Sequence, residues 1–302
     1  NFRFMKKNLL KIDFISFWPN FIKNDNYFYH LLNLNYEVVI DQINPDVVFF
    51  SYDYSGEKKF LEYSDRDCIK IFYTGENYYP EKEFYDYVFS FEETKGNNIR
   101  LPLWVLHINW FGLRNKSSRD ISFHINKKNL LNNKNIKLTN KMFCSFVASQ
   151  PKGKRVDFVP KLSQHKEIDC GGRLFNNINL VKGRGDQKWK YKFLSNYKFN
   201  IAFENEIANG YITEKIIQPM SVNSIPIYWG SEIVKQDFNP NSFIYSPDFS
   251  NDEELIEEII KLDSNKKNYL EKLNEPWFKD NKIPENFLPE FYLEKFSKEI
   301  LN

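Results

Sequence analysis

The sequence predicts an α/β protein with two domains, because buried strand patterns alternate with helical or polar segments and fall into two groups. Nine apolar runs rich in Val, Ile, Phe and Tyr have the length of strands and lack the alternation of a one-sided sheet. They occupy residues 9–17, 36–40, 46–52, 69–75, 87–91, 142–149, 199–203, 224–230 and 242–246. Such runs are typical of parallel strands that are covered on both faces.

A change in composition separates the two groups of strands. Residues 115–141 are polar, basic and rich in Asn, with little to pack into a core. We therefore expect a first domain over residues 1–138 and a second over residues 139–302. From Asp252 onward, apolar residues recur at helical spacing, which predicts helices that cover the second domain or reach back to the first.

Composition and charge limit the classes of protein to consider. The chain has 302 residues and 42% hydrophobic content, enough for a substantial core. Its 42 basic and 40 acidic residues leave a formal charge of +2, so no overall field attracts it to nucleic acid. Cys68, Cys144 and Cys170 show no C-x-x-C spacing, which favours a reducing compartment over a disulfide framework or a zinc site.

Location is predicted from the same features. No apolar stretch approaches the roughly 20 residues that cross a bilayer, and the first apolar run carries Asp13, so it is interpreted as a strand and not as a signal peptide. We expect a cytoplasmic protein with at most peripheral contact at the inner face of the membrane.

The stretch from Phe199 to Met220 has an unusual number of charges at a strand-to-helix turn. We expect a strand over 199–203, a helix capped by Thr213 and ending near Asn223, and a further strand over 225–229. In such a unit the turn lies at the carboxyl end of the sheet, where ligands bind and the helix amino terminus favours an anion. The alternative is that Glu214 merely complements the helix dipole and Lys215 is a solvated surface charge.

Several motifs resemble those of one family. "YKFNIAFENEIANGYITEKI" at 197–216, preceded by "DCGGRLFNN" at 169–177 and followed by "IPIYWGS" at 225–231, resembles the signature region of the α-1,3-fucosyltransferases, glycosyltransferase family 10. The resemblance continues in "IFYTGEN" at 71–77 and "RLPLW" at 100–104. It implies a GT-B fold, in which two Rossmann-like domains face each other across a cleft. The C-terminal domain would hold GDP-fucose and the N-terminal domain the acceptor sugar.

The resemblance also implies a reaction. L-fucose would pass from GDP-β-L-fucose, with inversion, to a hydroxyl of N-acetylglucosamine in a Gal-GlcNAc oligosaccharide, as in the synthesis of Lewis-type antigens on lipopolysaccharide or protein. This displacement needs a base for the hydroxyl proton and compensation for the charge that grows on the diphosphate. Acceptor choice would depend on loops near residues 18–27 and 78–84.

Roles for individual residues follow by match to the family motifs. The general base matches Glu76, the diphosphate-binding cations match Arg173 and Lys215, the ribose-binding carboxylate matches Glu214, and further donor-pocket residues match Asn205 and Tyr211. From position alone, other interpretations stay open: Glu76 as a solvent-facing loop residue and Arg173 as a surface arginine. Likewise, Asn205 is suited to a turn and Tyr211 to packing at a helix start.

No obligatory metal or cofactor is expected, since family members generally work without one. The Asp-x-Asp pair Asp65 and Asp67 precedes the strand at 69–73, at the wrong end of the sheet for a ligand. The four histidines also lack metal-ligand spacing: His30, His107, His124 and His165.

Three residues depart from the usual motifs: Gln150 where Asn is common, Cys170 where Ser is usual, and Glu206 where Ser is frequent. Glu206 matters most, because a carboxylate near the diphosphate repels it unless it points away or is paired with Arg or Lys. Two other functions are compatible with the same residues: transfer of another GDP-linked sugar, and non-catalytic carbohydrate binding through the abundant aromatic side chains.

Overall fold

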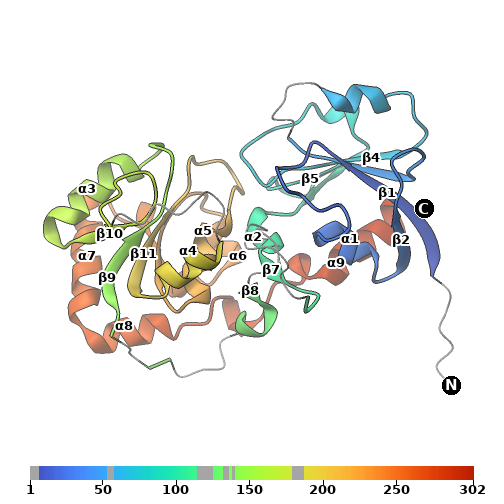
Figure 1. Ribbon diagram of the computed structural model, residues 1–302. Coiled ribbons are helices and arrows are strands. Elements are labelled where there is room, and N and C mark those ends of the chain that lie inside the picture. Colours follow the sequence, from blue (N-terminus) through green and yellow to red (C-terminus); the bar gives the residue numbers. More distant parts are fainter. Residues whose placement is uncertain (1–6, 53–57, 114–124, 132–135, 138–139, 179–186) are drawn as a thin grey trace, which may run out of the picture. The chain divides into compact units, whose positions relative to one another are not determined.

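The structure is a computed structural model that describes residues 7–52, 58–113, 125–131, 136–137, 140–178 and 187–302. The chain forms two compact units. The first unit consists of residues 1–106 and 285–302, and the second unit of residues 107–284. Each is built on a parallel sheet with helices packed against it (Figure 1).

The division between the units differs from the expected one. The predicted boundary at 138 and 139 itself lies outside the described residues, and the first unit already ends at Leu106. Part of the polar stretch is anchored in the second unit: the backbone of Ile136 exchanges hydrogen bonds with the Asn274 side chain, at 2.8 and 3.2 Å. Its composition resembles a linker, but these side-chain bonds attach it to one unit.

The first sheet has the strand order β2-β1-β3-β4-β5-β6, with every pair parallel. Its strands are β1 (Asn8–Ile15), β2 (Tyr36–Ile40), β3 (Val47–Phe50), β4 (Ile69–Tyr73), β5 (Tyr87–Ser90) and β6 (Asn98–Arg100). The helices of this unit are α1 (Tyr27–Leu32), α2 (Leu103–Leu106) and α9 (Pro289–Lys295), which continues as a π-helical turn (Phe296–Ile300).

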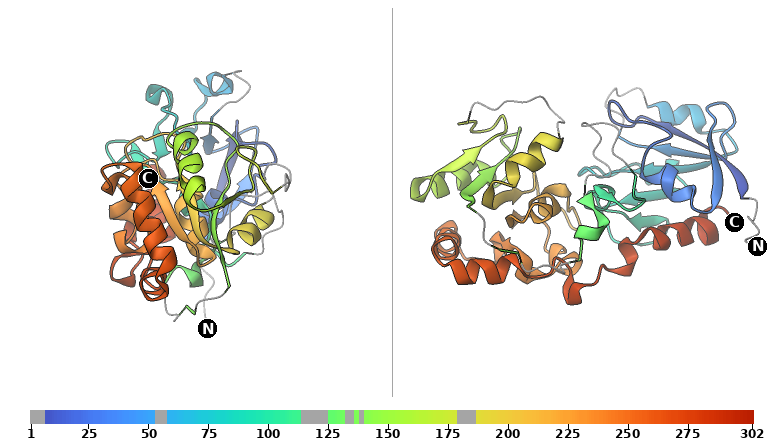
Figure 2. Two further views of the ribbon diagram at one scale, coloured as in Figure 1. Left: turned by 90° about the vertical axis from the view of Figure 1, so that its left-hand side faces the viewer. Right: turned by 60° about the horizontal axis from the view of Figure 1, so that its bottom comes forward.

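Aromatic side chains join the end of the chain to the first sheet. Phe296 stacks on Phe89 of β5, with ring centroids 5.5 Å apart, and also contacts Phe49 of β3 at 6.1 Å. The hydroxyl of Tyr292, which is fully buried, donates to the carbonyl oxygen of Arg100 at 3.0 Å. Figure 2 shows the red carboxyl-terminal helix against the blue and cyan strands. One of the two predicted positions of the tail, reaching back to the first domain, is therefore confirmed for α9.

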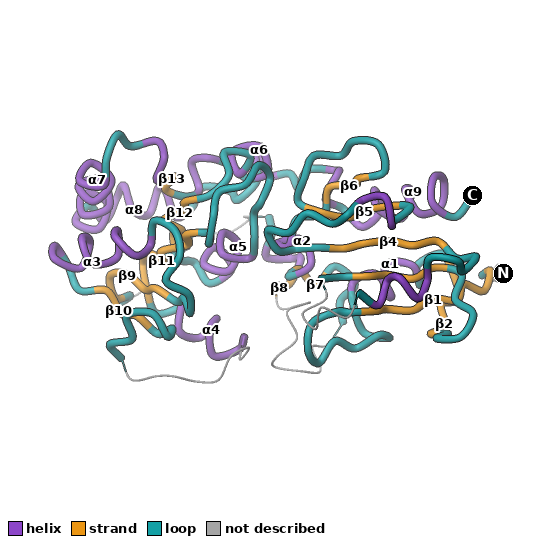
Figure 3. Tube along the Cα trace, turned by 90° about the horizontal axis from the view of Figure 1, so that it is seen from above, coloured by secondary structure: helices purple, strands orange, loops and turns teal. Residues whose placement is uncertain are grey.

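The second sheet has the order β10-β9-β11-β12-β13, again with every pair parallel (Figure 3). Its strands are β9 (Met142–Phe146), β10 (Ile168–Cys170), β11 (Tyr197–Phe203), β12 (Ile225–Trp229) and β13 (Ile244–Tyr245). Its helices are α3 (Arg155–His165), α4 (Gln187–Leu194), α5 (Glu214–Ser221), α6 (Val234–Asp237), α7 (Asp252–Ser264) and α8 (Lys266–Leu273). A separate two-stranded sheet joins β7 (Ile108–Asn109) to β8 (Ile125–Asn126).

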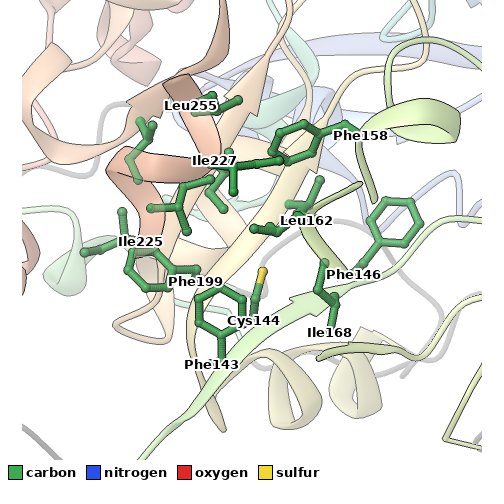
Figure 4. Close-up of a cluster of buried hydrophobic side chains, with 14 of the residues drawn as sticks. Phe143, Cys144, Phe146, Phe158, Leu162, Ile168, Phe199, Ile225, Ile227 and Leu255 are labelled. Atoms are coloured by element: carbon green, nitrogen blue, oxygen red, sulfur yellow. The ribbon is translucent and has the colours of Figure 1, made fainter. Parts of the chain in front are cut away.

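Side chains along β11 alternate between the two faces of the second sheet, and different helices cover each face. Phe199, Ile201 and Phe203 belong to a core that residues of α3, α7 and α8 complete. Figure 4 shows Phe199 in this core together with Phe158 and Leu162 of α3 and Leu255 of α7. The intervening residues of β11 line a pocket on the other face, together with residues of α4 and α5. The prediction that tail helices cover the second domain is thus confirmed for α7 and α8, and a polar site is left on the opposite face.

All nine predicted strand runs contain strands. The sequence missed the short strands β6, β7, β8 and β10, because two or three residues are too few for a periodic pattern. Among the described residues, no helix combines the length and the apolar character needed to cross a bilayer.

Candidate active site

A small pocket lies at the carboxyl ends of β9 and β11 in the second unit. The chain places β10 on one side of β9 and β11 on the other, so the strand order reverses between β9 and β11. Parallel α/β sheets bind ligands outside such a reversal. Lys190 of α4 and both Lys215 and Gln218 of α5 line the pocket, along with backbone and side chains of the two strands. Two ammonium groups and an amide suit this pocket to an anionic, hydrogen-bonding ligand.

The charged turn after β11 is organised by a carboxylate that the sequence-based site assignment left out. The side chain of Glu204 is completely buried. It accepts a hydrogen bond from the backbone N–H of Thr213 at 2.8 Å, from the hydroxyl of Thr213 at 2.8 to 2.9 Å, and from the hydroxyl of Tyr228 at 3.2 Å. The ammonium group of Lys215 adds an ion pair at 3.0 Å. A buried carboxylate needs such donors to offset its lost hydration.

These bonds fix the start of α5. Thr213 is the amino-terminal cap, as predicted, and its hydroxyl accepts from the backbone N–H of Lys215 at 3.4 Å. The same hydroxyl oxygen also accepts from the Lys215 ammonium group at 3.0 Å. Because Glu204 binds the capping residue and the lysine at once, it sets the direction in which the Lys215 side chain enters the pocket. Glu204 is recognisable in the sequence only as the residue directly after a buried strand.

A buried arginine contacts the last residue of β11, just before the charged turn. Arg155 of α3 is 2% exposed and donates to the carbonyl oxygen of Phe203 at 2.6 Å. Burial lowers the pKa of its guanidinium group, while the charge of Glu204 opposes that shift. Tyr211, expected in the donor pocket, is 2% exposed and is close enough to influence the same guanidinium. This burial fits the structural role that the sequence left open for Tyr211.

Glu214 is the first residue of α5 and is partly buried. Its carboxylate lies 3.7 Å from the ammonium group of Lys190, and the two side chains are 17% and 20% exposed. Burial alone would raise the pKa of Glu214, but the charges of Lys215, Lys190 and His107 outweigh it and hold the pKa well below its usual range. The carboxylate is thus kept ionised and able to accept hydrogen bonds. Lys190 was not predicted, because a lysine within a helical segment of a single sequence resembles any surface charge.

Arg173 lies in the loop after β10 and its side chain is exposed. A close approach of two backbones holds this loop beside the pocket. A Cβ atom on Gly172 would stand 2.2 Å from the carbonyl oxygen of Ala148, so only glycine fits there. Leu174 donates its backbone N–H to that oxygen at 3.0 Å, and Ala148 itself lines the pocket. The Gly-Gly-Arg motif therefore holds the exposed Arg173 in a loop that adjoins the pocket at Ala148.

Asn205 follows Glu204 directly and is partly exposed, in the loop between β11 and α5. Glu206, the departure expected to repel a diphosphate, lies 3.6 Å from the ammonium group of Lys152, and both side chains are about half exposed. The predicted condition that this carboxylate be paired with a basic residue is therefore met. Exposed pairs of this kind contribute little stability.

The other two departures lie near the ends of β9 and β10. Gln150 is exposed in the loop after β9. Cys170 is 3% exposed at the end of β10, and burial, with a smaller effect of Asp169, raises the pKa of its thiol to about 11. A thiol with such a pKa is largely protonated at neutral pH and packs as a small apolar group.

Glu76 belongs to the first unit. It follows β4 at the carboxyl end of the sheet, as predicted, and its side chain is exposed. The Thr74 hydroxyl accepts from the Glu76 backbone N–H at 3.1 Å, and the Glu76 carbonyl oxygen accepts from the Tyr78 backbone N–H at 2.7 Å. The backbone on both sides of Glu76 is thus fixed. Asp65 and Asp67 precede β4 at the opposite end of the sheet.

In the part of the chain that the structure describes, no three His, Cys, Asp or Glu side chains are grouped as metal ligands. The cationic groups found at the pocket are lysines, with an arginine in the neighbouring loop.

Comparison with solved structures defines the class of protein. A crystal structure of an α1,3-fucosyltransferase matches with a TM-score of 0.78 and 29% identity, over 98% of this chain and 91% of the other. One determined with GDP-fucose matches with a TM-score of 0.75 and 30% identity, over 100% and 93%. With two α/β units and an anion-suited pocket at a sheet reversal, the chain has the fold of a GT-B glycosyltransferase.

Sequence comparison defines the family. The model of the glycosyltransferase family 10 (fucosyltransferase) C-terminal region matches residues 136–291, and that of the α-(1,3)-fucosyltransferase FucT N-terminal domain matches residues 12–107. The chain belongs to glycosyltransferase family 10.

Curated relatives agree with this placement. The α-(1,3)-fucosyltransferase FucT of Helicobacter pylori is 33% identical over 272 residues, which are 82% of this chain and 55% of the relative. The α-(1,3)-fucosyltransferase fut-1 of Caenorhabditis elegans is 28% identical over 233 residues, or 72% and 52% of the two chains. The chain thus spans about half the length of these curated relatives.

Proposed function

We propose that this protein transfers L-fucose from GDP-β-L-fucose to a hydroxyl of N-acetylglucosamine in a Gal-GlcNAc oligosaccharide, forming an α-1,3 linkage. The observation that carries the proposal is the pocket at the β9–β11 reversal, which Lys215 lines, with Arg173 in the adjoining loop. A nucleoside diphosphate leaving group develops negative charge that such cations stabilise. Membership of family 10 and the similar structure determined with GDP-fucose support the choice of donor.

The proposed reaction is a single displacement. The acceptor oxygen forms a bond to the anomeric carbon of fucose from the face opposite the diphosphate. The bond from that carbon to the phosphate oxygen breaks, and GDP leaves with the electron pair. Attack from the opposite face converts the β-linked donor into an α-linked product.

Glu76 is proposed as the base that takes the acceptor hydroxyl proton. Its support is the match to the family motif and its place at the carboxyl end of β4 on a fixed backbone. Glu76 is an exposed residue at that strand end.

Donor binding is proposed to use the other predicted residues. Lys215 and Arg173 would bind the diphosphate, Glu214 would accept the ribose hydroxyls, and Asn205 with Tyr211 would complete the pocket. The ionised state of Glu214 suits it to this acceptor role. No metal is proposed in the reaction, and a cytoplasmic location remains a proposal from the cysteine usage of the sequence.

The test is incubation of the protein with GDP-fucose and Galβ1-4GlcNAc in the presence of a chelator. Mass spectrometry should find a fucosylated trisaccharide and an equal amount of GDP, and NMR should assign the linkage to the 3-hydroxyl of N-acetylglucosamine. Binding of GDP-fucose without product would contradict the proposed acceptor. Absence of GDP-fucose binding would contradict the donor.

A second acceptor class has specific support. The GDP-fucose protein O-fucosyltransferase 3 of Xenopus tropicalis is 30% identical over 192 residues, which are 61% of this chain and 39% of that relative. Fucose transfer to a protein hydroxyl would use the same donor site. Incubation with folded and unfolded polypeptide acceptors, scored by a mass increase of one deoxyhexose, distinguishes this candidate from the oligosaccharide.

A further inference from the structure

We propose that Lys190 is a positioning residue, which holds the Glu214 carboxylate where it accepts the ribose hydroxyls of the bound nucleotide. The inference rests on the proposed function, since it assumes that the pocket binds GDP. Lys190 lies on α4, lines the pocket, and places its ammonium group 3.7 Å from a Glu214 oxygen.

Two carboxylates of the turn, Glu204 and Glu214, form ion pairs with different lysines. Lys215 lies 3.0 Å from both the Glu204 carboxylate and the Thr213 hydroxyl oxygen. Glu214 is paired instead with Lys190. Removal of Lys190 therefore takes away the ion-pair partner of Glu214 while the bonds around Glu204 remain.

The geometry of the Lys190–Glu214 pair allows Lys190 to position the Glu214 carboxylate without using up its hydrogen-bond acceptor sites. At 3.7 Å the two groups attract each other but are too far apart for a normal hydrogen bond. An ionised carboxylate offers about four lone-pair sites, so Glu214 keeps acceptor capacity for two ribose hydroxyls. Its low pKa, maintained against burial by Lys215, Lys190 and His107, leaves it in the accepting form.

Packing holds Lys190 in place. Phe193 and Leu194 bury α4 against the rest of the unit, and Trp189 stacks on Phe193 with centroids 5.3 Å apart. The Gln218 amide of α5 donates to the Gln187 side-chain oxygen of α4 at 3.2 Å, which joins the two helices directly. A lysine on a well-packed helix has a fixed backbone, so it can hold a partner side chain in one position better than a lysine on a mobile surface segment can.

The experiment measures the affinity of GDP and of 2′,3′-dideoxy-GDP by calorimetry. The dideoxy compound keeps the base and the diphosphate but lacks the two hydroxyls that Glu214 would bind. We expect Lys190→Met to weaken GDP binding about tenfold, the value of one charge-assisted hydrogen bond, and to leave dideoxy-GDP binding nearly unchanged. Lys190→Arg should restore most of the loss. The matched control is Lys192→Met, because Lys192 lies on the same helix and is exposed.

A double-mutant cycle tests whether Lys190 acts through Glu214. With Glu214→Gln in place, Lys190→Met should cause no further loss of GDP affinity. Thermal unfolding of each variant establishes that it is folded. If Lys190→Met does not fold, Lys190→Gln, which keeps hydrogen-bond donors without the charge, takes its place in the cycle.

The outcomes separate this inference from the proposed function. If the unaltered protein does not bind GDP, the proposed function itself fails. If it binds GDP and Lys190→Met behaves like Lys192→Met, the role of Lys190 is refuted. Equal losses for GDP and dideoxy-GDP would assign Lys190 to the diphosphate and overturn its role in positioning Glu214.

Discussion

Replacement of Glu204 by Gln is expected to destabilise the second unit strongly, although the two side chains have nearly the same shape. Glu204 is completely buried and receives only donors: the N–H and hydroxyl of Thr213, the hydroxyl of Tyr228 and the ammonium group of Lys215. A Gln side chain has one oxygen to accept from them, and its amide N–H₂ group faces another donor.

The magnitude follows from these bonds. An amide oxygen at the Oε1 position retains three of the four, and the amide N–H₂ group then faces the Lys215 ammonium group. One hydrogen bond between charged groups is lost, at about 1.5 to 3 kcal/mol, and the three others are weakened because their acceptor is no longer charged. Because the Lys215 side chain is 21% exposed, water partly compensates the lysine. We therefore expect a loss of about 2 to 4 kcal/mol in the free energy of unfolding.

The assay is urea unfolding followed by tryptophan fluorescence. The matched control is Glu206→Gln, two residues further on, where the carboxylate is about half exposed and paired at 3.6 Å; its effect should stay within about 0.5 kcal/mol. In the Glu204→Gln background, Lys215→Met should recover part of the lost stability, because it removes the unpaired cation. Equal effects of the two glutamate substitutions would refute the conclusion that Glu204 organises the turn.

Four other expectations concern activity and chemistry. Glu76→Gln should lower turnover at least about a hundredfold with nearly unchanged GDP-fucose affinity; steady-state kinetics that show normal turnover would remove Glu76 as the base. Arg173→Ala should weaken GDP binding about tenfold or more and also slow turnover, measured by calorimetry and product formation, and no change in either would misplace the diphosphate site. The folded-state pKa of Glu214 is lowered, so its contribution to stability is present above its unfolded pKa of about 4.3 and is lost as the pH falls toward the folded value; a stability difference between the unaltered protein and Glu214→Gln that grows with acidification would contradict this. Cys170 should resist iodoacetamide at pH 8 in the folded protein, since burial raises its pKa to about 11, and rapid modification detected by mass spectrometry would show that β10 opens readily.

The sequence predicted that the helices of the tail either cover the second domain or reach back to the first. The structure contains helices of both kinds. Helical spacing after Asp252 identifies amphipathic helices, but spacing does not state which sheet receives their apolar faces. That is decided by shape at each sheet: Leu255 and Ile259 of α7 fit the core of the second unit, whereas Phe296 stacks on Phe89 of the first.

The division of the chain shows a similar limit. The polar stretch at residues 115–141 was interpreted as a domain boundary, whereas the first unit ends at Leu106. A linker and a polar segment fixed by side-chain hydrogen bonds have the same composition, and the partner of Ile136 is 138 residues away in Asn274. Contacts at such separation leave no local pattern.

By itself, the sequence determined the α/β class, the strands long enough to show a buried run, the Thr213 cap and the family, because these depend on local residue type and on ordered motifs. Only the tertiary structure decided which charges meet: that Glu204 binds Thr213, Tyr228 and Lys215, and that Glu214 is paired with Lys190. A charged side chain that is buried loses its hydration, and this cost must be offset by an oppositely charged or hydrogen-bonding partner. Burial and partners both arise from residues distant in sequence, so the charges of this site acquire their roles only when β11, α4 and α5 pack together.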